Sequence, residues 1–318
     1  MNIAILMALL PAIFWGSVGL VSAKMGGTPA QQTIGISFGT MIFGMIVMFG
    51  YAIPHGFYLG PEIWVTGFFS GLFWVIGISA LFMLFQRMGV SLGVPLSTGG
   101  QVVMNALLAA TLLGEWTNLT MWLVGLFSIL LVVAGVVLIS RPEKDENATE
   151  KQESRIDSKS ILYLLLAVGG FVLYFILPNY LAKLGYISNS VKTAGDGLNF
   201  TLAILGPQSI GQVIGAILIT VFVFREGKTM FAKPSWRNLL TGLFQALGNL
   251  FMFLSAANPA VGQTIATTLS QLNIIVGTFG GIYLLNEKKS PRQMKAIIAG
   301  TILVVVGAII IGNIHAFA

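Results

Sequence analysis

The sequence predicts an all-α membrane protein in which ten transmembrane helices form an inverted repeat of five plus five. Three observations carry this prediction. Of the 318 residues, 56% are hydrophobic and only 9% are charged, whereas a soluble domain is about 25% charged. About ten apolar stretches each reach the roughly 20 residues that a membrane-spanning helix needs. Short motifs of the first half recur in the second half at a nearly constant distance along the chain.

The same composition excludes several classes of protein. The mean hydropathy is +0.88, and no soluble core of this size can bury that much apolar surface, so lipid must be the solvent. A soluble enzyme, a nucleic-acid-binding protein and a secreted domain are therefore excluded as descriptions of the whole chain. The net charge of +6 sits in loops, where basic residues orient a chain in the membrane. With no cysteine and two histidines, we expect no catalytic group, metal site or cofactor.

The first half, residues 1–140, holds five expected spans. We read the first as a retained helix rather than a cleaved leader, because its first basic residue is Lys24 and its apolar run contains Pro11 and Trp15. Each span is long enough to cross about 30 Å of hydrocarbon. They cover residues 3–23, 31–53, 62–85, 90–113 and 119–140.

Residues 141–159 separate the two halves. This stretch contains eleven charged side chains, five basic and six acidic, and it has no apolar periodicity. Such a composition cannot bury enough apolar surface to fold alone. We therefore expect a solvated, disordered linker.

The second half, residues 160–318, holds the other five expected spans. The start of the seventh span is the least defined, because residues 185–198 are polar and contain glycine, which suits a loop or a re-entrant segment. The five spans cover residues 160–182, 199–224, 237–257, 262–285 and 293–314.

The two halves share an ordered series of motifs. The offset between matching motifs is about 171 to 172 residues, and one inserted residue between the third and fourth spans reconciles the two values. Because five is an odd number, the halves must insert with opposite topology, which is a transporter design with a site near the membrane midplane. The matches are Gly71-Leu72-Phe73 with Gly242-Leu243-Phe244, Leu113-Gly114-Glu115 with Leu285-Asn286-Glu287, and Val132-Val133-Ala134-Gly135 with Val304-Val305-Val306-Gly307.

The distribution of basic residues predicts an orientation. The linker and the loops after spans one, three, seven and nine carry 15 of the 17 lysines and arginines, while the opposite loops carry only Lys183 and Lys192. The positive-inside rule then places the linker in the cytoplasm and both termini outside.

Ionisable side chains are almost absent from the centres of the spans. Glu62, Glu115 and Glu287 lie at span ends, and no span has a carboxylate at its middle. Deep charges usually mark ion pathways, so a neutral, hydroxylated substrate fits better than an inorganic ion. Glu115 and Glu287 correspond through the repeat and could cap helices, bond across a loop, or couple transport to protons.

Neutral polar side chains gather in the fourth and ninth spans. Such groups are costly at lipid depth unless they are paired, so they either line a substrate site or join helices by hydrogen bonds. Asn105 shares a helix face with Gln101. Asn249 in the eighth span and Tyr174 in the sixth, which corresponds to Trp15, are further candidates. The predicted substrate-binding set is Trp15, Ser97, Thr98, Gln101, Gln208, Ser270 and Gln271.

Two features of this set have a second reading. Trp15 could stack on the apolar face of a sugar ring, or it could be an interfacial anchor, although it lies well inside its span. Pro95 and Pro207 could mark a discontinuous helix or a hinge beside a cavity, or they could be plain kinks.

Six short motifs are spread over both halves of the chain, at Leu9–Ser17, Pro95–Gln101, Leu113–Trp116, Gly206–Gly211, Leu269–Gln271 and Gly280–Tyr283. Together they resemble the glucose/ribose porter family of the drug/metabolite transporter superfamily, and the resemblance covers essentially the whole chain. It implies a ten-helix sugar permease of low-G+C Gram-positive bacteria that takes up glucose or ribose with a proton. One stretch departs from the glucose-type pattern, because residues 77–81 lack the glutamines that such members carry. The superfamily is usually drawn with both termini in the cytoplasm, against the charge distribution here.

The expected function is a secondary transporter for a neutral monosaccharide, most directly glucose, coupled to a proton and working by alternating access. It would be a multi-pass protein of the bacterial plasma membrane with no nucleic-acid partner. The alternatives are a carrier of ribose or of another small neutral metabolite or drug, and more distantly a membrane subunit that does not transport. A monomer and an oligomer are both compatible with the sequence.

Overall fold

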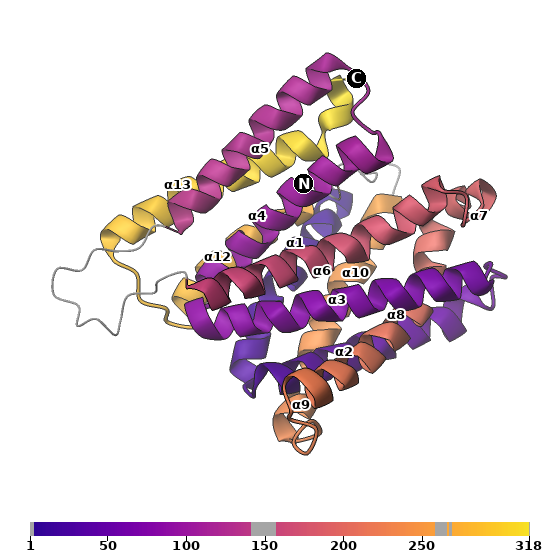
Figure 1. Ribbon diagram of the computed structural model, residues 1–318, viewed down its shortest axis with the longest axis horizontal. Helices are drawn as coiled ribbons and strands as arrows, with labels where there is room; N and C mark the ends of the chain where they lie inside the picture. The colour runs from indigo at the N-terminus through magenta and orange to yellow at the C-terminus, as the bar shows by residue number, and fades with distance from the viewer. Residues whose placement is uncertain (1–2, 141–156, 258–265, 267–268, 318) are drawn as a thin grey trace.

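The computed structural model describes residues 3–140, 157–257, 266 and 269–317. In the first half, two of the five long helices continue directly into π-helical turns, and Figure 1 shows how the helices are arranged. The elements are α1 (Ile3–Met25), α2 (Pro29–Val47) with its turn η1 (Met48–Ala52), α3 (Pro61–Met88), α4 (Val90–Leu108) with its turn η2 (Ala109–Leu113), and α5 (Leu119–Ile139).

Helices and their connections also make up the described part of the second half. Its elements are α6 (Ser158–Lys183), α7 (Asn189–Thr193), α8 (Leu198–Leu218) with its π-helical turn η3 (Ile219–Val223), α9 (Lys233–Arg237), α10 (Leu239–Ala257), α12 (Asn273–Leu284), α13 (Pro291–Gly312) and the 3₁₀ turn η4 (Ile314–Phe317). Within the described ranges there is no strand, and nine helices are long and apolar enough to cross a membrane. The predicted all-α membrane class is confirmed.

The predicted spans agree with these helices except around the ninth. Residues 258–265 and 267–268, which include the start of the predicted span 262–285, lie outside the described part, and α12 begins only at Asn273. The polar stretch 185–198 contains the short helix α7. Most of the predicted linker also lies outside the described residues, and Asp157 already caps α6.

Local sequence signals explain where α2 and α13 begin. Thr28 Oγ1 accepts a hydrogen bond from the Gln31 N–H (3.3 Å), and Gln31 Oε1 accepts one from the Thr28 N–H (3.2 Å). Ser290 and Gln293 form the same reciprocal pair before α13. In both helices proline occupies the first helical position, where its fixed φ suits the helix and its missing N–H costs nothing.

Large apolar side chains cover much of the outer surface. Leu119 and Leu130 on α5 are 74% and 66% exposed, and Phe222 in η3 is 72% exposed. A surface of this kind would aggregate in water, but lipid solvates it without penalty. These helices therefore face the hydrocarbon.

Glycines allow the helix backbones inside the bundle to touch. A methyl group on Gly71 of α3 would overlap the carbonyl oxygen of Gln208 on α8. A methyl group on Gly135 of α5 would lie 2.5 Å from the carbonyl oxygen of Gly300 on α13. Helix association in lipid relies on close packing of this kind. Lipid tails are as apolar as the helix surfaces, so the hydrophobic effect does not drive helices together there.

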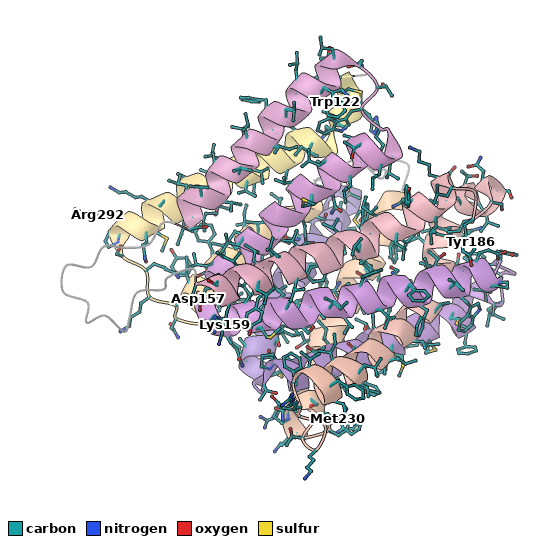
Figure 2. The ribbon with its side chains drawn as sticks, in the orientation of Figure 1. Trp122, Asp157, Lys159, Tyr186, Met230 and Arg292 are labelled. Atoms are coloured by element: carbon teal, nitrogen blue, oxygen red, sulfur yellow. The ribbon has the colours of Figure 1, made fainter. Side chains whose placement is uncertain are left out.

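The ends of the helices fall into two groups. We call the end where the chain enters and leaves the linker the linker end. Figure 2 shows Asp157, Lys159 and Arg292 at this end, while Trp122 and Tyr186 lie toward the opposite end.

Polar contacts join the two halves of the chain at the linker end. Arg87, in the last turn of α3, pairs with Asp157, the residue that caps α6. Asn238 Nδ2 donates to the carbonyl oxygen of Gly26 (3.0 Å), just after α1. The α1–α2 and α8–α9 connections are also tied, because Thr28 Oγ1 donates to a carboxylate oxygen of Glu226 (2.6 Å).

Candidate functional site

The polar side chains of α4 lie along the face that packs against α12. A side chain on Gly281 would lie 2.6 Å from the backbone nitrogen of Ser91, and one on Gly277 would lie 2.7 Å from Val94. The two helices therefore run antiparallel, and the same face of α4 continues from Val94 through Thr98, Gln101 and Asn105 at intervals of three and four residues. If this pairing continues along both helices, these polar residues of α4 lie opposite the start of α12.

The ninth span is broken at that point. Leu269 and Ser270 are helical, Gln271 and Leu272 form a turn, and α12 begins at Asn273. The turn is tightened by bonds that span three residues, from the Leu272 N–H to the Leu269 oxygen (3.1 Å) and from the Ile274 N–H to the Gln271 oxygen (3.3 Å). Interrupted helices at membrane depth are typical of transporter binding sites.

The interruption lies at neither of the two prolines that could have marked one. The helices α4 and α8 run without interruption through Pro95 and Pro207, so neither proline marks a discontinuous helix. The broken segment contains no proline or glycine at the turn. Its signal is the run of short polar side chains around Ser270 and Asn273, which compete with the helix for backbone hydrogen bonds.

Trp15 links α1 to α10. Its Nε1 donates to Oδ1 of Asn249 (3.1 Å), and the same oxygen accepts a bond from Gln245 Nε2 (3.3 Å). A side chain on Gly248 would overlap the indole ring. Trp15 also packs on an apolar cluster that includes Ala266. The indole is therefore held in a fixed orientation beside the helical residues that precede the break.

The backbone of α1 also touches the first residue of α12. A side chain on Gly16 would lie 2.7 Å from the carbonyl oxygen of Asn273. The side-chain oxygens Oδ1 of Asn273 and of Asn105 are buried and accept no hydrogen bond from the residues that the structure describes. A buried acceptor without a donor costs about 1–3 kcal/mol, which a ligand hydroxyl would recover.

These contacts define a candidate site between α1, α4, α10 and the turn before α12. It contains an indole, several amides and two open acceptors, and the helices around it are nearly free of charge. Over their described lengths α4, α10 and α12 carry no aspartate, glutamate, lysine or arginine, and α1 carries only Lys24 in its last turn. The residues of the candidate site are Trp15, Gln101, Asn105, Asn249 and Asn273.

The predicted site residues occupy different environments. Gln101 Nε2 donates to Oγ of Ser97, one turn earlier on α4 (3.1 Å). Ser97 and Ser270 are buried, whereas Thr98 and Gln271 are partly exposed. Sequence reasoning did not single out Gln245, although its spacing of four residues from Asn249 on α10 was a usable signal.

Gln208 lies in a different contact. Its Nε2 donates to Ser70 Oγ on α3 (2.8 Å), and Ser70 Oγ donates to the carbonyl oxygen of Tyr174 on α6 (2.9 Å). This buried chain joins three helices. It favours the packing interpretation for Gln208 over substrate lining.

Gln208→Met tests that interpretation. We expect the unfolding free energy in detergent to fall by about 0.6–1.7 kcal/mol, the range for interhelical hydrogen bonds in membranes, because Ser70 loses its donor while the side-chain volume is kept. Affinity for a ligand of the candidate site should stay within about twofold. Gln101→Met is the matched comparison, and it should weaken ligand binding. A large affinity loss in Gln208→Met would place Gln208 in the site.

No group of three or more histidine, aspartate or glutamate side chains suited to a metal ion occurs among the residues that the structure describes. The five residues of the candidate site offer neutral hydrogen-bonding groups and one aromatic face.

Comparisons with known proteins agree with a membrane carrier. The model of the family described as "Sugar transport protein" matches residues 6–314. The "Glucose uptake protein GlcU" of Bacillus subtilis is 34% identical over 308 residues, which cover 97% of each chain. The "Probable glucose uptake protein GlcU" of Priestia megaterium is 36% identical over 308 residues, covering 97% of this chain and 98% of that protein.

A solved structure, described as a crystal structure, has a similar arrangement of helices. It superposes with a TM-score of 0.56 and covers 96% of this chain and 95% of its own, at 14% sequence identity. At this identity the likeness concerns the arrangement of the helices alone.

Proposed function

The chain belongs to the sugar transport protein family, and from this premise we propose that it is a secondary transporter that carries glucose as a neutral monosaccharide. It is a multi-pass bacterial membrane protein. The resemblance to a family of sugar uptake proteins, first drawn from short motifs, is confirmed over nearly the full length. Transport rather than catalysis is the activity that this membership supports.

One observation carries the choice of substrate. The candidate site has two buried amide oxygens without donors, on Asn105 and Asn273, and no charged side chain among its residues. A sugar offers several hydroxyl donors and no charge, so it satisfies both acceptors without bringing an uncompensated charge into a medium of low polarity. Zwitterions and nucleotides would lack a countercharge there.

The fixed indole of Trp15 supports a ring-shaped substrate. The apolar C–H face of a pyranose packs on an aromatic ring, while its edge hydroxyls reach the amides of Gln101 and Asn249. Aromatic side chains contribute large contact area with little loss of conformational entropy. The relatives from Bacillus subtilis and Priestia megaterium are named as glucose uptake proteins, and ribose or another small neutral metabolite is the alternative that the same groups would admit.

The proposal includes an inverted repeat of residues 1–140 and 160–318, joined by the linker. Support comes from helix contacts that occur twice, with partners shifted by about 171 to 172 residues, as a repeat would require. Thr40 Oγ1 donates to Gln212 Oε1 (2.7 Å), and these two residues are separated by 172 positions. Two contacts are duplicated. Gly71 lies against the Gln208 oxygen as Gly242 lies against the Ile36 oxygen, and Gly211 lies against the Phe68 oxygen as Gly39 lies against the Leu239 oxygen.

Alternating access follows from this architecture. Rocking one half against the other would open the candidate site to each side of the membrane in turn. The orientation proposed from the basic loops puts the linker end in the cytoplasm. Coupling to a proton is proposed from the family resemblance, and a carboxylate at a helix end, Glu115 or Glu287, would carry it.

The test is uptake of labelled glucose and ribose by purified protein in liposomes, with and without an inward proton gradient. We expect saturable glucose counterflow that unlabelled glucose blocks and that empty liposomes lack. Acceleration by the gradient would support symport, and indifference would leave a uniporter. Absence of uptake of either sugar by folded protein would overturn the sugar proposal.

A further inference from the structure

The helix α4 begins without a cap of its own. It starts directly after Gly89, whose φ is 81°, and no side chain near its start in the sequence accepts a bond from its first N–H groups. These N–H groups have no partner inside the helix and must find acceptors elsewhere.

Glu287 supplies the missing acceptors from the other half of the chain. Its Oε1 accepts the N–H of Val90 (2.7 Å), its two oxygens share the N–H of Ser91 (3.3 and 3.2 Å), and Oε2 also accepts the Ser91 hydroxyl. The carboxylate lies at the positive end of the α4 dipole, which favours a negative charge. Bonds of this charge-assisted kind are about twice as strong as neutral ones.

The surroundings are shaped to hold this carboxylate. A side chain on Gly89 would lie 2.6 Å from Glu287 Oε2, so only glycine leaves room for it. The ammonium of Lys289 lies 3.8 Å from the same oxygen, and the two side chains are only 11% and 17% exposed. Burial lowers the pKa of Lys289, while the charge of Glu287 acts in the opposite direction.

Within the part of the chain that the structure describes, the corresponding residue of the first half, Glu115, caps no helix with its side chain. Glu115 follows Gly114 with φ 75°, as Glu287 follows Asn286 with φ 57°, and each glutamate N–H bonds to the carbonyl six residues earlier. The local backbone is therefore alike. The Glu115 side chain is 43% exposed and lies 3.9 Å from His315, near the opposite end. Glu115 therefore lies away from the start of α4 and serves as the comparison for Glu287.

We propose that Glu287 is a positioning residue that holds α4 against the α12–α13 connection and closes the linker end of the transport site. The helix α4 carries Gln101 and Asn105, and α12 carries Asn273, so this one carboxylate fixes the two helices that bear most of the site. Opening of the linker end requires the carboxylate to leave the α4 terminus. This inference rests on the proposed transport function.

A purely structural cap would have a different signature. Its loss would loosen the protein everywhere, whereas loss of a closing contact exposes the space between α4 and α12 and leaves the rest of the core protected. The chain has no cysteine, so single introduced cysteines can report each place separately.

Two reporter positions separate the outcomes. Val94→Cys lies between α4 and α12, against Gly277, about one turn from the Glu287 contact. Val75→Cys lies in the fully buried core of α3. Each reporter is placed in the otherwise unchanged chain, reconstituted in nanodiscs, and reacted with a membrane-impermeant maleimide.

We expect Glu287→Gln to raise the labelling rate at Val94→Cys at least about tenfold and to leave Val75→Cys unreactive. Glu115→Gln is the matched control and should change neither rate. If Glu287→Gln does not fold, Ser91→Ala removes one bond to the carboxylate and should raise labelling at Val94→Cys several-fold. The proposal would be overturned if Glu287→Gln left the labelling rate at Val94→Cys unchanged, or if it raised the labelling rates at both reporters equally.

Glucose counterflow by the same preparations separates this inference from the proposed function. Transport by the parent chain with no labelling response to Glu287→Gln would reject the closing contact and keep the carrier. A labelling response in a chain that moves no sugar would keep the closing contact and reject the carrier.

Discussion

Asn273→Ala should abolish most glucose transport while leaving the protein at least as stable as the parent without sugar. The Oδ1 atom of Asn273 is buried and accepts no hydrogen bond, so its removal relieves a desolvation cost in the empty protein. The same oxygen should accept a sugar hydroxyl in the complex. Loss of that bond is worth about 1–3 kcal/mol, which corresponds to about a tenfold to hundredfold weaker sugar affinity.

Thermal unfolding with and without glucose measures both effects. The parent should unfold at a higher temperature when glucose is present, and Asn273→Ala should lose that shift. Asn105→Ala should behave in the same way, because its Oδ1 is also open. Asn179→Ala is the control, since this side chain donates only to the Phe175 carbonyl on the outside of α6. A full glucose-induced shift in Asn273→Ala would remove Asn273 from the site.

The second large effect concerns folding. Gly71→Leu should reduce the yield of monodisperse protein at least about tenfold, because its side chain would overlap the backbone carbonyl of Gln208. Overpacking costs about 1–3 kcal/mol in a core that can adjust, and two helix backbones in contact cannot adjust without moving apart. Size-exclusion chromatography of a fluorescent fusion in detergent gives the measurement.

Gly169→Leu is the matched control for this prediction. Gly169 also lies in the middle of a long helix, α6, but a side chain there would meet nothing within 4 Å. It should yield normal amounts of folded protein. Equal yields from Gly71→Leu and Gly169→Leu would contradict the role of close backbone contact between α3 and α8.

The fold was predictable because lipid imposes a strong and local constraint. Each membrane helix must satisfy its own backbone and present apolar side chains, so helices such as α3 and α13 can be read directly from runs of about 20 residues. The capping boxes at Thr28 and Ser290 likewise depend on neighbours three residues away. The break before α12 escaped prediction because it depends on polar side chains rather than on proline.

The site was predictable only in part, because its partners are distant in sequence. The polarity of Trp15 and Gln101 at membrane depth pointed to a role for each. Nothing local showed that Trp15 would bond to Asn249, 234 residues away. Gln208 looked like the other polar candidates, and only its contact with Ser70 distinguishes it. A polar residue in a span predicts that it has a partner, but not whether the partner is a helix or a substrate.

The cap of α4 comes late in biosynthesis. Val90 and its acceptor Glu287 are separated by 197 residues, which a ribosome needs about 10–40 s to add. During that interval Glu287 cannot serve the first N–H groups of α4, and water at the membrane surface is left to accept their hydrogen bonds. The contact between α4 and the α12–α13 connection therefore forms only after nearly the whole chain has been made.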